Sequence, residues 1–272
     1  MQDESAKRES RTAIITGAAG GLGACFARKL ASRGYGLMLV DRREDALTAL
    51  CDELAPQYRV RVEPLVVDLT DEEAVAGLAT RLAATPDLEM LVNNAGFGVA
   101  RFFVDADVER HVDMVRVHVL AAVRLTHSVL PAMLDRNRGA VINVSSLNAW
   151  APCAGVVSYS ATKAYLTVFS QALHDELRGT GVRIQALCPG FVRTEFHDAP
   201  GMKDGFNPGQ VPGFMWMTPE QVVDCSLLAL PRGRAVVMPG LFNRIAGRLM
   251  QMPIAQPIVR ALVRQDRTLG EA

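Results

Sequence analysis

The sequence predicts a single doubly wound α/β domain, built on a parallel sheet with helices on both faces. From Thr12 onward, short apolar runs alternate with longer amphipathic runs, which is the pattern of successive βαβ units. A glycine-rich stretch, Thr16 to Gly23, follows the first apolar run. The chain has 272 residues, enough for one large domain with a substantial core. Ligands would then bind at the carboxyl ends of the strands.

The expected elements follow one another along the chain, each strand a short apolar run and each helix a longer amphipathic run. The expected strands are 12–16, 36–40, 60–67, 90–92, 141–144, 183–187 and 235–238. The expected helices are 22–33, 44–54, 72–83, 107–137 with an internal break, and 158–180. The domain is therefore expected over 12–240, after a flexible polar tail at 1–11 and before a C-terminal helical extension at 241–272.

The composition disfavours several classes of protein. Twenty-nine basic and 29 acidic residues give a formal net charge of zero, which disfavours a nucleic-acid partner. The five cysteines are odd in number and lack paired spacing, so we expect reduced thiols, no disulfide framework, no metal site and a cytoplasmic location. The polar first residues do not resemble a secretory signal, and we expect no run long enough for a membrane span.

The glycine-rich stretch lies where the first strand gives way to the first helix. Glycines at this point let the backbone turn sharply and approach a pyrophosphate, whose charge is met by the helix N-terminus. Its position between a strand and a helix makes a dinucleotide site of Rossmann type a stronger interpretation than a plain turn. The residues expected to contact the cofactor here are Thr16, Gly17, Ala19, Gly20, Gly21, Leu22 and Gly23.

Asp41 ends the second strand, where a carboxylate can accept hydrogen bonds from both ribose hydroxyls of an adenosine and repel a 2′-phosphate. This favours NAD. Arg42 and Arg43 follow directly, and Arg42 could instead accommodate the 2′-phosphate of NADP. Both arginines could also simply cover the solvent face of the next helix.

Two further strand ends carry candidate cofactor residues. Asp68 could bind the adenine amino group with Leu69 against the ring, or could cap the following helix. The small residues of Asn93-Asn94-Ala95-Gly96 would let the backbone lie close to a cofactor, although a plain turn would look the same.

Tyr159 and Lys163 form a candidate catalytic pair, because positions i and i+4 share one face of a helix. A lysine ammonium beside a phenol stabilises the phenolate and lowers the phenol pKa, which makes the tyrosine a usable acid and base. Ser146, at the end of the apolar run 140–145, could hold the reacting oxygen. Alone, such a pair is more often a packed ring beside a snorkelling lysine.

Together these residues resemble the short-chain dehydrogenase/reductase family over nearly all of the stretch from Thr12 to about Gly240. The motifs occur in the family's order and at its usual spacings. They are the Thr-Gly-x-x-x-Gly-x-Gly turn at Thr16 to Gly23, Asn93-Asn94-Ala95-Gly96, Ser146, Tyr159-x-x-x-Lys163, and Pro189-Gly190-Phe191-Val192-Arg193-Thr194.

The resemblance implies a role for each of these groups. Tyr159 would be the general acid and base, Ser146 would polarise the substrate oxygen, and Lys163 would hold the nicotinamide ribose. The segment from Pro189 and Gly190 through Val192 to Thr194 would bind the carboxamide and orient the nicotinamide. The chain would then interconvert a secondary alcohol and a ketone by hydride transfer.

One position departs from the family pattern. The family's helix before the serine carries an asparagine whose backbone holds a water in a proton relay, and here His118 takes that place. The histidine could preserve the relay and add a group that titrates near neutral pH, or it could satisfy a buried hydrogen bond.

The stretch 195–218 takes the place of the family's substrate-covering loop. It is rich in glycine and proline and contains Phe196, Phe206, Phe214 and Trp216. With Trp150 and Phe97 near the same rim, these side chains suggest a lipophilic alcohol or ketone as substrate, Trp150 and Phe196 being the expected contacts. They could equally pack against the protein itself.

The extension after Gly240 repeats apolar residues at helical spacing with arginines interleaved. It is short and interrupted by Pro253 and Pro257, so packing on protein is favoured over contact with a membrane surface. The resemblance also implies a homodimer or homotetramer, formed through the helices at 107–137 and 158–180. A non-redox enzyme or a regulatory cofactor-binding protein on the same scaffold is the alternative function.

Overall fold

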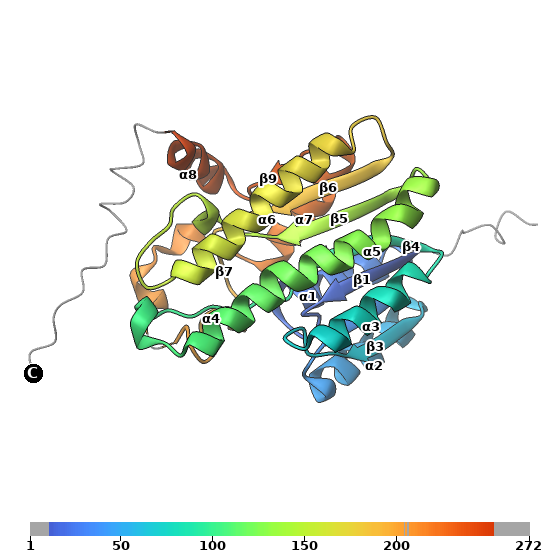
Figure 1. Cartoon of the computed structure of the whole chain (residues 1–272), viewed down its shortest axis with the longest axis horizontal. Coiled ribbons are helices and arrows are strands. Elements are labelled where there is room, and N and C mark those ends of the chain that lie inside the picture. The colour runs from blue at the N-terminus through green and yellow to red at the C-terminus, as the bar shows by residue number, and fades with distance from the viewer. Residues whose placement is uncertain (1–10, 204, 206, 253–272) are drawn as a thin grey trace, which may run out of the picture.

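The computed structural model describes residues 11–203, 205 and 207–252. Its centre is a seven-stranded parallel sheet in the order β3-β2-β1-β4-β5-β6-β9 (Figure 1). The chain reverses direction across the sheet between β1 and β4, so the carboxyl ends of these strands border a crevice. The strands are β1 (Thr12–Thr16), β2 (Gly36–Asp41), β3 (Val62–Val66), β4 (Leu88–Asn93), β5 (Gly139–Val144), β6 (Val182–Leu187) and β9 (Val236–Val237).

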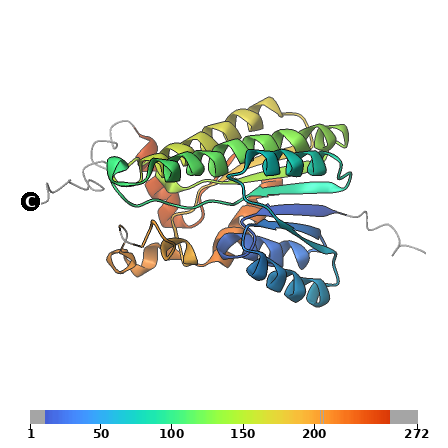
Figure 2. The ribbon, with the colours of Figure 1, turned by 60° about the horizontal axis from the view of Figure 1, so that its bottom comes forward.

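Helices cover both faces of this sheet, which confirms the predicted fold class (Figure 2). One face carries α1 (Gly21–Ala31), α2 (Glu44–Tyr58) and α7 (Pro219–Ala229), whose apolar residues share one core cluster with the sheet. The other face carries α3 (Glu72–Ala83), α4 (Val108–Val115), α5 (Ala122–Asp135) and α6 (Val157–Glu176). Two separate cores explain why the strands read as continuous apolar runs.

The structure corrects three details of the predicted elements. The expected break within 107–137 is a π-helical segment, Arg116–Ala121, which joins α4 to α5 in one continuous helix. Helix α7 was not expected, although Thr218 and Gln221 form a capping box at its start. The loop 195–218 contains short 3₁₀ turns and the strand β8 (Trp216–Met217), which pairs with β7 (Phe191–Val192).

The continuous helix Val108–Asp135 is long and apolar enough to cross a membrane, judged by length and composition alone. The sequence had suggested no such segment. Its α5 part packs against α3 and the sheet, and its α4 part packs against α6. This is the position of a core helix, which meets the same criteria of length and composition.

Buried polar side chains tie the strands together just behind the crevice. Asn93 and Asn143 are register partners on β4 and β5, and the Asn93 Nδ2 donates to Asn143 Oδ1 over 2.8 Å. Asn93 Nδ2 also donates to Thr126 Oγ1 of α5 at 3.1 Å, and Asn143 Nδ2 donates to Ser170 Oγ of α6 at 2.9 Å. These bonds fix the position of α5 and α6 relative to the strand ends.

The predicted flexible tail at 1–11 lies, apart from Arg11, outside the described residues. The described part of the C-terminal extension is helix α8 (Leu241–Gln251). The stretch from Pro253 onward, for which apolar residues with interleaved arginines were noted, lies outside the described residues, as does Phe206.

Candidate active site

The glycine turn between β1 and α1 is closely packed at two of its glycines. A Cβ on Gly23 would come within 2.1 Å of the Gly17 carbonyl oxygen, and Gly17 itself has a φ of +64°. Helix α1 begins without a side-chain cap at Gly20 and without an acidic residue in its first turn, which includes Leu22. Its first amide N–H groups are therefore available for an anion, and this chemistry fits the pyrophosphate of a dinucleotide.

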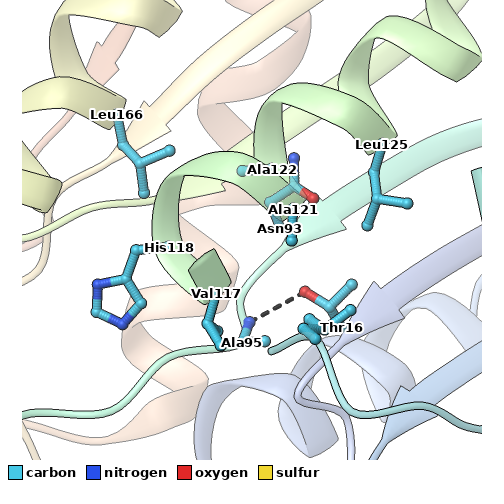
Figure 3. A pocket seen from close by; sticks show the side chains of 10 residues that line it. Thr16, Asn93, Ala95, Val117, His118, Ala121, Ala122, Leu125 and Leu166 are labelled. Carbon is cyan, nitrogen blue, oxygen red and sulfur yellow. Dashed lines mark hydrogen bonds between the residues drawn. The ribbon is translucent and has the colours of Figure 1, made fainter. Parts of the chain in front are cut away.

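Thr16 and Asn94 fasten this turn to the segment after β4. Thr16 Oγ1 accepts hydrogen bonds from the backbone N–H groups of Asn94 and Ala95, both over 3.0 Å. Figure 3 shows the bond from Ala95. Asn94 Nδ2 donates to the carbonyls of Thr16 and Gly17, over 2.9 and 3.0 Å. Asn94 therefore supports the glycine turn from behind, and the backbone at Ala95 and Gly96 lies beside it.

Asp41 is buried at the carboxyl end of β2, and its partner is Arg43 rather than Arg42. Its Oδ1 accepts from Arg43 Nε at 3.1 Å and its Oδ2 from Arg43 Nη2 at 3.2 Å, while the Ala19 N–H also donates to Oδ2 at 3.0 Å. Burial acts to raise the pKa of Asp41, but these hydrogen bonds outweigh it and hold the pKa below its ordinary value. A charged carboxylate thus stands next to the glycine turn.

Arg42 points elsewhere. Its Nη1 lies 3.9 Å from Asp68 Oδ2, and both side chains are about half exposed. Asp68 Oδ1 accepts from the N–H and the hydroxyl of Thr70, and Asp71 is the residue that caps α3. Leu69 is buried against α3. Asp68 and Arg42 together therefore form a polar edge beyond the end of β3, at the adenine side of the predicted site.

Ser146, Tyr159 and Lys163 come together at the end of β5. Ser146 caps a short 3₁₀ turn, where its Oγ accepts the Asn148 N–H at 3.2 Å, and its side chain acts to lower the pKa of Tyr159. Lys163 Nζ lies 5.6 Å from the centre of the Tyr159 ring and donates to the Val144 carbonyl at 2.8 Å. A serine, a tyrosine and a lysine thus converge from β5 and α6.

The pKa values of this group differ from the expectation that Lys163 lowers the pKa of Tyr159. Burial raises the pKa of Tyr159 to about 12, although the hydrogen bond with Ser146 opposes the rise. Burial lowers the pKa of Lys163 to about 8. The neighbouring Cys188 thiol is fully buried, and burial raises its pKa to about 12, so it is an unreactive thiol.

The segment from Pro189 to Thr194 leads from the end of β6 to the glycine turn. The Pro189 carbonyl accepts the Leu147 N–H at 3.0 Å, which joins this segment to the turn after Ser146. Val192 is buried on β7, and the Thr194 methyl group lies 3.3 Å from the place where a Cβ on Gly21 would be. The structure therefore brings Thr194 to the glycine turn.

Gly190 packs against Asn243 of α8, which connects the extension to the site. Asn243 is buried and its Nδ2 donates to the Pro239 carbonyl at 2.8 Å. Phe242 and Ile245 on the outer side of α8 are 43 % and 51 % exposed. Helix α8 thus packs on the protein through its Asn243 side, and its apolar outer side is partly exposed, with the Phe242 ring 5.4 Å from the Phe214 ring.

Aromatic side chains border the tyrosine. The rings of Phe196 and Tyr159 lie 5.8 Å apart, and Trp216 packs against Phe191 and His197 with ring distances of 5.5 and 5.3 Å. Trp150 is half-buried at the end of the turn that Ser146 begins. Some side chains of the loop thus face the site while others pack on one another, and Phe196 is the one that reaches Tyr159.

His118 lies at the junction of these parts, in the π-helical segment. Its Nε2 accepts the Phe97 N–H at 3.1 Å and its Nδ1 is 2.9 Å from Thr162 Oγ1. A small cavity separates it from Thr16 and the sheet, with Asn93 among its lining side chains (Figure 3). The structure therefore places His118 within the site.

Two charged residues at the glycine turn were not recognised as contacts from the sequence. The sequence predicts a contact for Arg42 and not for Arg43, because nothing in the pattern orients either side chain. The Glu195 carboxylate lies 3.3 Å from the position of a Cβ on Gly20, opposite the Arg43 guanidinium. Because Glu195 directly follows Thr194, its place in the sequence could have identified it as a residue near the glycine turn.

Comparison with known proteins agrees with this geometry. A model of the family described as short chain dehydrogenase matches residues 11–203. The very-long-chain 3-oxoacyl-CoA reductase of Macaca fascicularis is 34 % identical over 187 residues, which are 67 % of this chain and 60 % of that protein. The chain thus matches less than two thirds of that relative's length.

Solved structures match over nearly the whole chain. A short-chain dehydrogenase from Sphingobium yanoikuyae in complex with NADPH has a TM-score of 0.80 and 31 % identity, and the match covers 96 % of this chain and 98 % of that one. A bulky-bulky ketone specific alcohol dehydrogenase from Comamonas testosteroni has a TM-score of 0.77 and 28 % identity, with coverage of 97 % and 98 %.

Proposed function

The chain belongs to the short chain dehydrogenase family of oxidoreductases, and we propose that it interconverts a secondary alcohol and a ketone with a nicotinamide cofactor. The convergence of Ser146, Tyr159 and Lys163 at the carboxyl end of β5, in the sheet whose first strand leads into the glycine turn, is the observation that carries this proposal. Turnover is tested by following the absorbance of the reduced nicotinamide across a panel of alcohols and ketones. Cofactor binding without turnover on any of them would favour a regulatory protein instead.

The proposed mechanism assigns one task to each of the three side chains. When bound, the nicotinamide supplies or accepts the hydride. Tyr159 donates its phenolic proton to the carbonyl oxygen during reduction, and its raised pKa keeps that proton on the phenol at neutral pH. In the oxidation direction the phenol must first lose its proton, and the phenolate then accepts the proton of the alcohol. Ser146 donates a hydrogen bond to the same oxygen, and Lys163 binds the ribose next to Tyr159.

We propose NAD as the favoured cofactor. Asp41 is held in its charged form at the end of β2, so it can accept hydrogen bonds from the ribose hydroxyls and repel a 2′-phosphate. Arg43 weakens this preference, since its guanidinium lies on Asp41 and could contact such a phosphate.

Binding of NADH and NADPH, measured by quenching of tryptophan fluorescence, tests this choice. We expect tighter binding of NADH by the wild type. Asp41→Asn should weaken NADH binding and strengthen NADPH binding, whereas the matched variant Arg43→Gln should weaken NADPH binding only. Tighter binding of NADPH by the wild type would reverse the assignment.

We propose that the substrate is lipophilic. Phe196 lies against Tyr159, and the sulfur of Met202 approaches Gly98 on the same side of the site. Two similar proteins are named for a very-long-chain 3-oxoacyl-CoA and for bulky-bulky ketones, which agrees with a large apolar pocket. Phe196→Ala should raise KM selectively for large ketones. A higher kcat/KM of the wild type for small polar polyols than for long-chain or polycyclic ketones would reject the proposal.

We propose a homodimer or homotetramer in the cytoplasm. Apolar side chains are exposed along α4, the π-helical segment and α6, and the five cysteines are free, as in a reducing compartment. The exposed side chains that support the interface include Val112, Val115, Leu120, Tyr165 and Val168. Light scattering should give a dimer or tetramer that Val168→Asp dissociates, while Leu228→Asp, an equally exposed control on α7, should have no effect.

For α8 we propose contact with protein rather than with a membrane surface. The helix has only 11 residues, and its Asn243 side already packs on the domain. Flotation with anionic lipid vesicles should leave the protein at the bottom of the gradient. Co-flotation that is lost on Phe242→Ser would favour the membrane.

A further inference from the structure

His118 is held between two segments that carry active-site groups. It is 1 % exposed and belongs to the π-helical segment, and its ring contacts the loop after β4 and helix α6. Its Nε2 accepts the backbone N–H of Phe97, and its Nδ1 bonds with Thr162, one residue before Lys163. One imidazole thus joins the rim of the site to the helix that carries Tyr159.

The hydrogen bonds define which nitrogen carries the proton. A backbone N–H can only donate, so Nε2 must present its lone pair to Phe97. In the neutral ring the proton is therefore on Nδ1, which donates to Thr162 Oγ1. Thr162 in turn donates to the Tyr159 carbonyl at 3.0 Å, which gives a chain of bonds running one way from His118 to the Tyr159 backbone.

A proton cannot pass through this ring. Relay would require Nε2 to gain or release a proton, but the group that faces it is an amide N–H, which offers neither a donor acid nor an acceptor. Charging the ring would also set two N–H groups against each other. Burial and the Lys163 cation lower the pKa of His118 well below its ordinary value, and the other cation on this side, Arg110, stands over the Phe97 ring at 4.7 Å.

The surrounding packing holds the imidazole in place. The Phe97 and Tyr159 rings meet the imidazole edge-on, with centroid distances of 5.8 and 6.0 Å. A Cβ on Gly96 would come within 2.7 Å of Nε2, so the glycine leaves the room that the ring occupies.

We propose that His118 is a positioning residue that stays neutral as the Nδ1–H tautomer and clamps the Phe97 loop to the turn of α6 that carries Tyr159. This inference rests on the proposed oxidoreductase function for its kinetic consequences, but not for the state of the ring. It replaces the proton relay that the position of His118 had suggested.

Two nearly isosteric substitutions separate the two ends of the clamp. In His118→Asn the amide nitrogen falls near Nδ1 and keeps the bond with Thr162, while the bond with Phe97 is lost. In His118→Gln the amide oxygen falls near Nε2 and keeps the bond with Phe97, while the bond with Thr162 is lost. Each variant therefore removes about one hydrogen bond, which corresponds to a five- to tenfold effect.

We expect His118→Asn to raise KM about five- to tenfold with little change in kcat, and His118→Gln to lower kcat by a similar factor with little change in KM. The pH profile of kcat should keep its shape in both. His127→Asn, an exposed control on α5, should change nothing. Equal loss of kcat in both variants with a limb of the pH profile removed would show a relay and overturn the proposal.

A measurement on the wild type tests the ring without any turnover. The ¹⁵N chemical shifts of the His118 imidazole should show the Nδ1–H tautomer from mildly acidic to mildly alkaline pH. A ring that titrates near neutral pH, or the Nε2–H tautomer, would refute the inference. If no substrate is ever turned over, the proposed function fails while this spectrum still decides the role of His118.

Discussion

Replacing Lys163 by methionine should raise the free energy of unfolding at neutral pH and remove one source of its pH dependence. Lys163 is 4 % exposed, and its ammonium has the Val144 carbonyl as a hydrogen-bond partner. A buried charge with so little compensation destabilises the folded state. Methionine has a similar length and no charge, so the substitution removes the charge and keeps most of the packing.

The magnitude follows from the pKa of Lys163, which is lowered from 10.5 to about 8. Because the folded pKa is depressed, the unfolded chain binds more protons between these values, and stability rises with pH through that window. The full shift corresponds to about 3 kcal/mol, of which about 2 kcal/mol is recovered between about pH 7 and about pH 9.5. Loss of the Val144 contact subtracts a constant of about 1–3 kcal/mol, which does not depend on pH.

Urea unfolding under reducing conditions, followed by the fluorescence of Trp150 and Trp216, measures this effect. The stability of Lys163→Met relative to the wild type should fall by about 2 kcal/mol between about pH 7 and about pH 9.5. Lys29→Met is the matched control, because its hydrogen bond with Asp224 raises the pKa of Lys29 and makes its contribution constant over this range. A difference between Lys163→Met and the wild type that does not change with pH would refute the reasoning, since it would mean that the ammonium is solvated.

Two other substitutions test the geometry of the site. Gly23→Ala should lower the free energy of unfolding by about 3 kcal/mol or more, since its Cβ would lie 2.1 Å from the Gly17 carbonyl oxygen. A Cβ on Gly20 meets only flexible side-chain ends. The control Gly20→Ala should therefore keep the stability of the wild type and weaken cofactor binding. Equal unfolding midpoints in urea would contradict this. Tyr159→Phe should lower kcat by about a thousandfold or more at unchanged cofactor affinity. The control Tyr165→Phe, on the exposed side of α6, should leave kcat unchanged. Substantial turnover by Tyr159→Phe would show that Tyr159 is not the general acid.

Features of the fold and the site could be predicted from the sequence where a residue type is compatible with few structural environments. The alternation of apolar runs predicted the parallel sheet because strands buried on both faces must be apolar throughout. The Ser-Tyr-Lys set and the glycine turn stood out because polar groups and glycines at the ends of such strands are costly without a function. Helix α7 could also have been predicted, since Thr218-Pro219-Glu220-Gln221 carries a capping box with proline at the first position.

Other features depend on contacts between distant residues and could not be predicted locally. His118 in the π-helical segment bonds with Phe97 and Thr162, which lie in separate parts of the chain. The choice between Arg42 and Arg43 depends on which side chain can fold back on Asp41. The pKa of Tyr159 is set by burial, and the sequence shows only that Lys163 is near.

The contact between Asp41 and Arg43 links these observations to the choice of cofactor. To bind a 2′-phosphate, the Arg43 guanidinium would have to leave Asp41 in part, and Asp41 would keep the Ala19 N–H and the Arg43 N–H as partners beside the new negative charge. Hydrogen bonds between charged groups contribute about 1.5–3 kcal/mol, and the half-exposed position of Arg43 reduces the loss to about 1 kcal/mol. This corresponds to roughly fivefold weaker binding of NADP than of NAD from this contact alone. Cofactor preference should therefore be modest and should reverse with the single change Asp41→Asn.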